Sequence, residues 1–291
     1  MDTVVSIQVV CGESNSMEMV EAQINRAFEA FYHVEQACSR FSIDSELMRA
    51  CRQIETPVPV SPFLFEPLKF ALEMAQWTDG VFDPTVGKVM EEHGFNRHYL
   101  TGQSVQSTVT DSELVTYRDI VLNQQDRTLY LKTPLVIDLG AVAKGFAIDL
   151  AANELNQFEG FVVNAGGDLF AGGVNEQGYP WEIGIQHPES KEHIIHTLDV
   201  SNKAVCTSGS YERKSVDVTG MHHIYNPTTR QSPNDWISCT VIAPFAMMAD
   251  AFSTASFMLG LEKGSRLIEQ VGLEGILISS KLQIVKVGGV L

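Results

Sequence analysis

The sequence predicts an α+β fold, in which mixed sheets pack against helices, and one compact domain over residues 1–291. The fold class follows from the mixed order of helical and strand patterns. They show neither the strict alternation of a parallel α/β fold nor the helix-free pattern of a sandwich. The single domain follows from what the chain lacks: an internal repeat, a low-complexity segment and a Pro/Gly/Ser-rich linker.

Apolar spacing predicts the helices. In residues 18–38 the apolar side chains recur at the spacing of an amphipathic helix. Ser61 and Pro62 form a helix start, so a second helix runs to about Trp77, unless Pro67 delays its beginning. Further helices are expected at residues 143–157, 246–259 and 262–270.

Short runs rich in β-branched residues predict the strands. The first lies at residues 3–10, and a hairpin with a turn at 124–127 occupies residues 119–137. Further strands are expected at residues 160–164, 168–174, 181–187, 194–200, 203–208, 222–225 and 236–243. A last hairpin pairs residues 274–279 with 282–287.

Charge and cysteine usage exclude several classes of function. The net charge is −16, from 20 basic and 36 acidic residues, so the surface repels nucleic acid and no such partner is expected. The five dispersed cysteines form neither a disulfide framework nor a zinc pattern.

The chain also lacks membrane and export signals. No apolar run reaches the roughly 20 residues of a transmembrane helix, so none is expected. The first ten residues lack a basic segment and a cleavage site, which predicts a cytoplasmic protein. A signal or lipid-anchor segment removed from the chain would instead place it in the periplasm.

Two polar residues in the helix expected at 246–259 form a candidate metal site. Asp250 and Thr254 are four residues apart, so their side chains share one helix face with Cβ atoms roughly 5–6 Å apart. A carboxylate and a hydroxyl supply hard oxygen ligands, which suit Mg²⁺ or Ca²⁺ rather than zinc. A structural role is equally open, because Thr254 can bond to the preceding turn and Asp250 can serve the start of the helix.

Residues 136–149 predict an anion site. An apolar strand runs into Asp138-Leu-Gly140, and a helix then begins whose free N–H groups can bind an anion. Lys144 in its first turn adds a point charge suited to phosphate. The segment matches neither a Walker A loop nor the dinucleotide-fold glycine pattern, so Lys144 as a solvated helix residue is an equal alternative.

Three other segments are rich in turn-forming and polar residues. Asn164–Asp168 places two glycines between expected strands, and residues 78–87 follow an expected helix; each is consistent with an ordinary turn. His222 and His223 precede a proline turn. A lone histidine is usually structural, but an unperturbed pKa near 6.5 makes His223 a suitable general base.

Read in order, nine segments of the chain resemble the ApbE family of FAD:protein FMN transferases. They are Met1–Thr3, Ser39–Leu47, Thr78–Gly87, Ile137–Asp149, Val163–Asp168, Trp181–Pro188, Thr207–Arg213, His223–Pro227 and Ala249–Thr254. Each motif alone is moderately specific, but nine in this order over nearly the whole chain are a specific signal. The resemblance implies an ApbE-like (T-fold-like) α+β fold.

The resemblance also implies a reaction and its partners. The FMN half of FAD would be transferred to a threonine or serine hydroxyl in the flavinylation motif of a target protein, and AMP would be released. A metal bridging the pyrophosphate and a base on the attacking hydroxyl suit such a phosphoryl transfer. A homodimer is possible.

The site residues are carried over position by position from the resemblance. Mg²⁺ would be held by Asp250, Thr254 and the backbone carbonyl of Ala141, with Ser253 at a further ligand position. His223 would be the base, and Tyr211 and Arg213 would border the flavin or the substrate. FAD would contact Met1, Phe41, Val81, Phe82, Asp83, Asp138, Lys144 and Ile224.

Departures from the family pattern leave alternatives open. Asp2 replaces a usual glycine, and Arg230 stands where glycine often closes a turn. Asn226 replaces the common aspartate, so it cannot serve as a carboxylate that orients His223. A Mg²⁺-dependent FAD pyrophosphatase, in which water attacks and FMN and AMP are formed, uses the same site. A flavin-binding protein without catalysis is the third alternative.

Overall fold

The computed structural model describes residues 3–12, 15–97, 102, 104–107, 109, 115–213, 215, 218 and 220–290. By its internal contacts the chain divides into two compact units. The first unit contains His33–Ala143 and Arg213–Pro233, and the second contains Thr3–Tyr32, Lys144–Glu212 and Asn234–Leu291. Because the chain passes from one unit to the other several times, neither unit is a continuous segment. A single domain over residues 1–291 stays a prediction.

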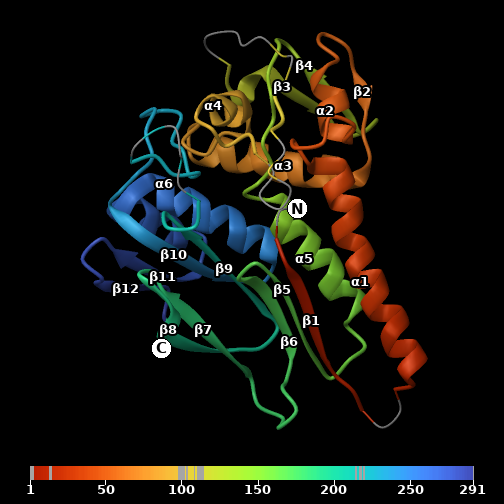
Figure 1. Ribbon diagram of the computed structural model, residues 1–291, viewed down its shortest axis with the longest axis vertical. Helices are drawn as coiled ribbons and strands as arrows, with labels where there is room; N and C mark the ends of the chain where they lie inside the picture. The colour runs from red at the N-terminus through yellow and green to blue at the C-terminus, as the bar shows by residue number, and fades with distance from the viewer. Residues whose placement is uncertain are drawn as a thin grey trace. The chain divides into compact units, whose positions relative to one another are not determined.

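The second unit is built on an antiparallel sheet of seven strands, counted in the described part of the chain (Figure 1). The strands follow in the spatial order β1 (Val5–Val10), β5 (Gly160–Ala165), β6 (Asp168–Gly173), β9 (Lys203–Gly209), β10 (Trp236–Ala243), β11 (Glu274–Ser279) and β12 (Ile284–Val287). The inner strand β10 is buried along nearly its whole length, so its sequence lacks a polar–apolar alternation.

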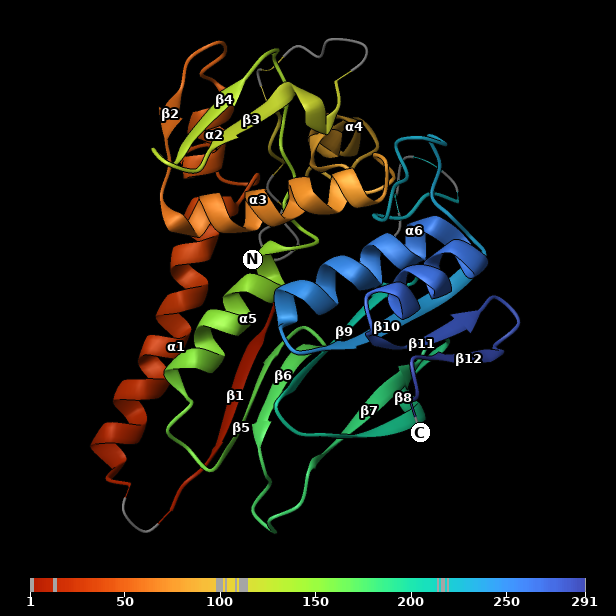
Figure 2. The same cartoon turned by 180° about the vertical axis from the view of Figure 1, so that it is seen from behind.

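Helices cover one face of this sheet. Helix α6 (Ala246–Gln270) packs against β9 and β10. Figure 2 shows it from the side opposite to Figure 1. Gly260 interrupts α6 with φ 78° and ψ −175°, which accounts for the two separate helices that the sequence predicts. Helix α5 (Ala143–Glu154) approaches α6 closely, because a Cβ at Gly145 would lie 2.3 Å from the carbonyl oxygen of Ala246.

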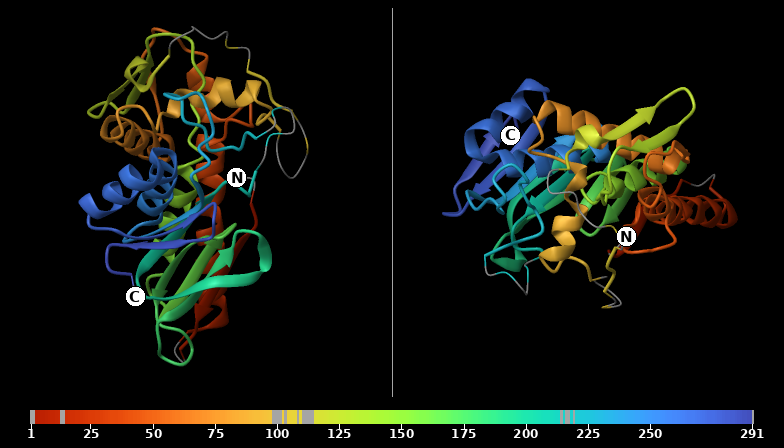
Figure 3. Two further views of the ribbon diagram at one scale, coloured as in Figure 1. Left: turned by 90° about the vertical axis from the view of Figure 1, so that its left-hand side faces the viewer. Right: turned by 90° about the horizontal axis from the view of Figure 1, so that it is seen from above.

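A hairpin of β7 (Trp181–His187) and β8 (Ser190–Val200) covers the other face. Figure 3 shows this hairpin and α6 on either side of the sheet. Along β9, Val205 packs into the apolar cluster under the hairpin, whereas Cys206 contacts the carbonyl of Ala246 in α6. The sheet is therefore the middle layer of a three-layer unit, and residues of its helix-facing side meet α6.

The first unit combines short helices with a small sheet. The end of α1 (Met17–Cys38) leads into α2 (Glu46–Cys51) and α3 (Pro62–Trp77). The strands β2 (Val58–Pro59), β4 (Thr128–Leu131) and β3 (Ile120–Asn123) pair in that order. The other elements are the short helix α4 (Gly87–Glu92) and the 3₁₀ turns η1 (Pro84–Val86) and η2 (Tyr117–Asp119).

Helix α3 starts at Pro62, so Pro67 does not delay its beginning. A proline inside a helix leaves the carbonyl four residues earlier without its N–H donor, which here is the carbonyl of Phe63. The thiol of Cys38 donates a hydrogen bond to that carbonyl at 3.2 Å. The buried cysteine thus supplies the donor that Pro67 removes.

The strand expected at residues 222–225 is wrong. The backbone of His222 is satisfied by the side chain of Ser232, which accepts from the His222 N–H at 3.1 Å and donates to its carbonyl at 2.8 Å. The β-forming residues Ile224 and Tyr225 are buried in a loop rather than paired in a sheet.

No helix in the described ranges is long and apolar enough to span a membrane.

Candidate active site

Helix α6 presents the carboxylate and the hydroxyl of the predicted metal site beside two further hydroxyls in the second unit. Asp250 and Ser253 are buried in α6, and Thr254 is half-buried. Ser208 of β9 lies 2.9 Å from both Ser253 Oγ and Thr254 Oγ1. The structure therefore groups the hydroxyls of Thr254, Ser253 and Ser208, and Asp250 precedes Thr254 by one helical turn; these side chains form the oxygen group of the second unit. The sequence placed Ser208 in the Thr207–Arg213 segment but gave it no role of its own.

The hydrogen bonds of this group have one consistent direction. Ser253 Oγ donates to the carbonyl of Asp250 at 2.9 Å, which uses its single proton. Because Ser253 has no proton left, Ser208 must donate to Ser253. The single proton of Ser208 is then used, so Thr254 must donate to Ser208. The lone pairs of Thr254 Oγ1 then remain available to a cation. Thr254 does not make the bond to its own helix that a purely structural role would give.

Lys144 lies between two carboxylates of the second unit. Its Nζ contacts the Asp168 carboxylate and lies 3.3 Å from Asp250 Oδ2. Asp168 also accepts from the Thr207 N–H at 2.7 Å, and Asp250 accepts from the Gly145 N–H at 3.2 Å. The reading of Lys144 as a solvated residue is therefore wrong, because its ammonium group forms ion pairs and is half-buried.

The start of α6 is capped from α5 rather than from its own sequence. The N-cap residue Phe245 makes no side-chain capping bond, and Asp149 accepts from the N–H groups of Ala246 at 2.6 Å and Met247 at 2.9 Å. Burial raises the pKa of Asp149 to about 6, and the charge of Asp250 adds to this, although the two N–H groups oppose it. Asp250 is thus not the residue that serves the helix start.

The donor groups beside Asp250 fit Mg²⁺. Within the described residues no three His, Cys, Asp or Glu side chains gather as metal ligands. A metal site here would therefore use one carboxylate together with hydroxyl and carbonyl oxygens. Mg²⁺ accepts such a set, because it is bound through one or two carboxylates and keeps several waters. The absence of thiol and imidazole groups in the set excludes a typical zinc site.

In the first unit, Asp138 is held by an arginine and a backbone N–H group. Arg40 Nε lies 2.5 Å from Asp138 Oδ2, and the Gly140 N–H donates to Oδ1 at 2.7 Å. Burial acts to raise the pKa of Asp138, but Arg40, the Gly140 N–H and Arg213 together lower it. Asp138 is therefore an ionised acceptor. Arg40 was missed in the sequence, although it stands within the Ser39–Leu47 motif.

The loop that carries Val81, Phe82 and Asp83 is tightly bonded. Asp83 Oδ1 accepts from Thr85 N and Oγ1, and Oδ2 accepts from the Tyr117 N–H at 2.9 Å. Burial raises the pKa of Asp83, and these bonds act in the opposite direction. Phe82 is buried and Val81 is half-buried. Asp83 thus organises this loop through its side chain, and its contact with FAD stays a prediction.

His223 is a neutral imidazole at pH 7. Burial and the positive charge of Arg213 lower its pKa to about 4, below the value near 6.5 that the sequence suggested. Nδ1 lies 3.3 Å from the carbonyl oxygen of Arg213, which can only accept a hydrogen bond. Nδ1 therefore carries the proton of the neutral ring, and Nε2 is unprotonated. Arg213 therefore orients His223 in place of a carboxylate.

The neighbouring Asn226 has a local role. Its Oδ1 accepts from the N–H groups of Thr228 at 2.9 Å and Thr229 at 3.2 Å, as in an Asx turn. Arg230 closes this turn in the left-handed region at φ 57°, where the family pattern has glycine. The two departures from the family pattern are thus parts of one turn after His223.

The predicted residues fall into two groups, one in each unit. Lys144, Asp250 and Thr254 lie together in the second unit. The first unit contains Phe41, Val81, Phe82, Asp83, Asp138, Ala141, His223 and Ile224. Met1 lies outside the described residues.

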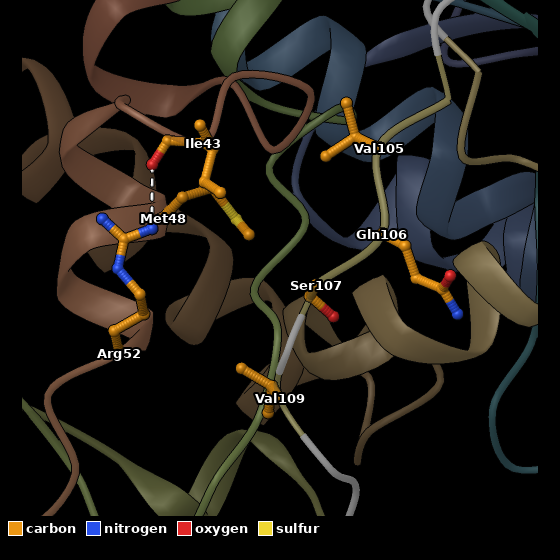
Figure 4. A pocket seen from close by; sticks show the side chains of 7 residues that line it. All are labelled: Ile43, Met48, Arg52, Val105, Gln106, Ser107 and Val109. Atoms are coloured by element: carbon orange, nitrogen blue, oxygen red, sulfur yellow. Dashed lines mark hydrogen bonds between the residues drawn. The ribbon is translucent and has the colours of Figure 1, made fainter.

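A small hollow in the first unit does not contain these groups (Figure 4). Arg52 at its edge donates to the carbonyl of Ile43 at 2.9 Å. The lining residues are Ile43, Met48, Arg52, Val105, Gln106, Ser107 and Val109. None of them is a predicted site residue, so the candidate site rests on the polar groups described above.

Comparisons with known proteins identify the family of the chain. Residues 1–277 match the ApbE family. The FAD:protein FMN transferase of Klebsiella pneumoniae is 30% identical over 285 residues, which cover 94% of this chain and 80% of the relative. The protein of the same name from Escherichia coli K12 is 31% identical over 259 residues, which cover 85% and 74%.

Solved structures show the same fold. The flavin transferase ApbE from Vibrio cholerae has a TM-score of 0.83 at 25% identity, covering 99% of this chain and 94% of its own. The ApbE protein from Thermotoga maritima also has a TM-score of 0.83, at 29% identity and 98% and 94% coverage. The fold and the relatives together define an α+β enzyme of the transferase class. The chain belongs to the ApbE family.

Proposed function

We propose that this chain transfers the FMN moiety of FAD to a threonine or serine hydroxyl of a target protein, with Mg²⁺, and releases AMP. The observation that carries the proposal is the family match over residues 1–277, with relatives named FAD:protein FMN transferase. The oxygen group of Asp250, Thr254 and Ser208 supports the metal requirement, because it offers hard ligands only.

The proposed reaction transfers one phosphoryl group, which carries the flavin, from AMP to the acceptor hydroxyl. The hydroxyl oxygen of the acceptor attacks the phosphorus on the flavin side of the FAD pyrophosphate. A phosphoester forms, the phosphoanhydride bond breaks, and AMP leaves with the bridging oxygen. The hydroxyl proton passes to a base, so the flavin remains attached to the target through its phosphate.

His223 is the proposed base. Its Nε2 is unprotonated at pH 7, because the pKa is about 4 and Nδ1 faces a carbonyl. A base of this pKa is weaker than an ordinary histidine, so His223 serves mainly by accepting the proton as the new bond forms. General-base help is typically worth roughly 10²–10⁴-fold in rate.

Asp250, Thr254 and the backbone carbonyl of Ala141 are the proposed ligands of Mg²⁺. When bound, the ion would neutralise charge on the pyrophosphate. Lys144 would add a further positive charge, and the distance of 3.3 Å from its ammonium group to Asp250 Oδ2 supports this role. Together these groups would favour an anionic substrate on a chain whose net charge is −16.

Asp138 is proposed to contact FAD as a hydrogen-bond acceptor. An ionised carboxylate repels phosphate, so its partner would be an N–H or hydroxyl group of the flavin or of the sugar chain. The other proposed FAD contacts are Met1, Phe41, Val81, Phe82, Asp83, Lys144 and Ile224. Of the two aromatic members, Phe41 is half-buried and offers a face or edge for a planar ring, whereas Phe82 is buried.

The proposal is tested by incubating the protein with FAD and either Mg²⁺ or EDTA, with and without a fragment carrying a threonine flavinylation motif. AMP release and denaturation-resistant flavin fluorescence on the fragment are read together. Metal-dependent AMP with a fluorescent fragment supports the transferase. AMP without labelling of any acceptor would instead indicate a pyrophosphatase, and tight FAD binding without AMP would indicate a flavin-binding protein.

A further inference from the structure

Arg40 is a buried cation of the first unit that contacts two distant segments and the ring of the next residue. Its side chain is 7% exposed, although it carries a full charge. The Nε atom is paired with Asp138 Oδ2, and Nη2 donates to the carbonyl of Phe95 at 2.6 Å. The guanidinium carbon lies 4.3 Å from the centroid of the Phe41 ring. Burying such a charge is costly unless it is paired and hydrogen-bonded, and these contacts meet that condition.

We infer that Arg40 is a positioning residue of the FAD site, which fixes the orientation of Asp138. The inference rests on the proposed function, because Asp138 is a proposed FAD contact. Arg40 itself has no assigned contact with FAD. It acts on binding through the Asp138 carboxylate, and its contacts with Phe41 and Phe95 keep the guanidinium group in place.

The geometry explains how the carboxylate is fixed. Asp138 Oδ2 is bonded to Arg40 and Oδ1 to the Gly140 N–H, so neither oxygen can exchange places with the other without breaking a bond. Arg40 cannot turn with Asp138, because Nη2 is anchored on the carbonyl of Phe95. The remaining lone pairs of Asp138 therefore have fixed directions, which is the condition for selective binding of one donor.

The contact with Phe41 requires the planar guanidinium group. A guanidinium lies flat on an aromatic ring and donates from its edge at the same time, whereas an ammonium group donates from a point. Lysine at position 40 would keep the charge but could not make all three contacts. The substitution Arg40→Lys thus separates charge from geometry.

Arg118 provides a matched control in the same unit. It lies 4.5 Å over the ring of the preceding residue, Tyr117, and is paired with Asp79 at 3.3 Å. The side chains of Arg118 and Asp79 are 62% and 92% exposed. Arg118→Lys therefore removes the same kinds of contact from the surface, where such pairs contribute little.

The test is a fluorescence titration of FAD with the full chain. We expect Arg40→Lys to raise the FAD dissociation constant about tenfold, a loss typical of one charge-assisted contact, and Arg118→Lys to change it less than about twofold. Because Arg40 acts through Asp138, its effect should shrink to less than about threefold in an Asp138→Asn background. Thermal unfolding of each variant shows that the titrated protein is folded.

Each outcome decides a separate point. Unchanged FAD affinity in Arg40→Lys would overturn the inference. It would also be overturned if Arg40→Lys lowered the FAD affinity equally in the unsubstituted chain and in the Asp138→Asn background. Failure of the unsubstituted protein to bind FAD would instead overturn the proposed function. If Arg40→Lys does not fold, Asp138→Asn is compared with Arg40→Met/Asp138→Asn, which removes both charges. These two should bind FAD within about threefold of each other, and a larger difference would contradict the inference.

Discussion

Single side chains define the chemistry of this chain through their immediate partners. Asp250 is paired with Lys144, and Thr254 is hydrogen-bonded to Ser208. His223 faces a backbone carbonyl. None of these partners is close in the sequence, so the sequence predicted candidate reactive residues but not the groups that orient them. The pKa of His223 shows the consequence, because burial and Arg213 lower it far below the value of a free imidazole.

We expect Asp250→Ala to abolish Mg²⁺-stimulated turnover, because it removes the carboxylate from the proposed ligand set. The measurement is AMP release from FAD over a Mg²⁺ titration. Glu262→Ala is a control on the same helix, since the Glu262 side chain is 82% exposed and pairs with Arg266 at 3.8 Å. Activity of Asp250→Ala equal to that of the control would show that the metal ligands are elsewhere.

We expect His223→Ala to keep its affinity for FAD but to lose roughly 10²–10⁴-fold in transfer rate. Fluorescence titration measures the affinity, and labelling of an acceptor fragment measures the rate. A substitution that lowers both equally would indicate a binding residue instead. Unchanged kinetics would remove His223 from the mechanism.

The pH dependence of the transfer rate tests the protonation state of His223. With a pKa of about 4, the imidazole is neutral and able to accept a proton throughout the neutral range. The rate should therefore not change through titration of His223 between about pH 6 and 8, and it should fall as the pH approaches 4. A loss of rate centred near pH 6.5, absent in His223→Ala, would contradict the lowered pKa.

Secondary-structure elements position these side chains by close packing. Helix α5 approaches α6 at Gly145, where a Cβ would lie 2.3 Å from the carbonyl oxygen of Ala246. One turn later, Asp149 caps the start of α6, which then carries Asp250 and Thr254 across β9. The orientation of the oxygen group therefore depends on the junction of two helices.

We expect Asp149→Ala to lower the free energy of unfolding by about 1–2 kcal/mol, because two buried N–H groups at the start of α6 lose their acceptor. Thermal or urea unfolding measures this change. Asp149→Asn, which keeps one acceptor oxygen, should lose less. Equal stability of the alanine variant and the unsubstituted protein would show that α6 needs no cap from α5.

The raised pKa of Asp149 also has a defined effect on stability. Because the folded state holds this proton up to about pH 6, it binds more protons than the unfolded state between pH 3.8 and 6. The contribution of Asp149 to stability therefore falls as the pH rises through that window. Asp149→Asn should remove this part of the pH dependence, which unfolding at several pH values would detect.

At the scale of the whole chain, the sequence predicts elements better than contacts. Helix α1 and strand β10 agree closely with their expected ranges, because apolar spacing and a continuous buried run are local signals. Residues 222–225 carry β-forming side chains, yet the backbone of His222 is satisfied by a serine ten residues away, which no local pattern reveals. Arg40 and Asp138 are 98 residues apart, so their ion pair was equally invisible.

The family match covers both compact units, and each unit contributes proposed site residues. The proposed transferase activity is therefore to be tested with the full chain. Its most direct test is the intact mass of an acceptor fragment after incubation with the protein, FAD and Mg²⁺. We expect a mass increase of one FMN moiety, which is lost when EDTA is added or when threonine in the motif is replaced by alanine. An acceptor of unchanged mass, while FAD is converted to FMN and AMP, would contradict it.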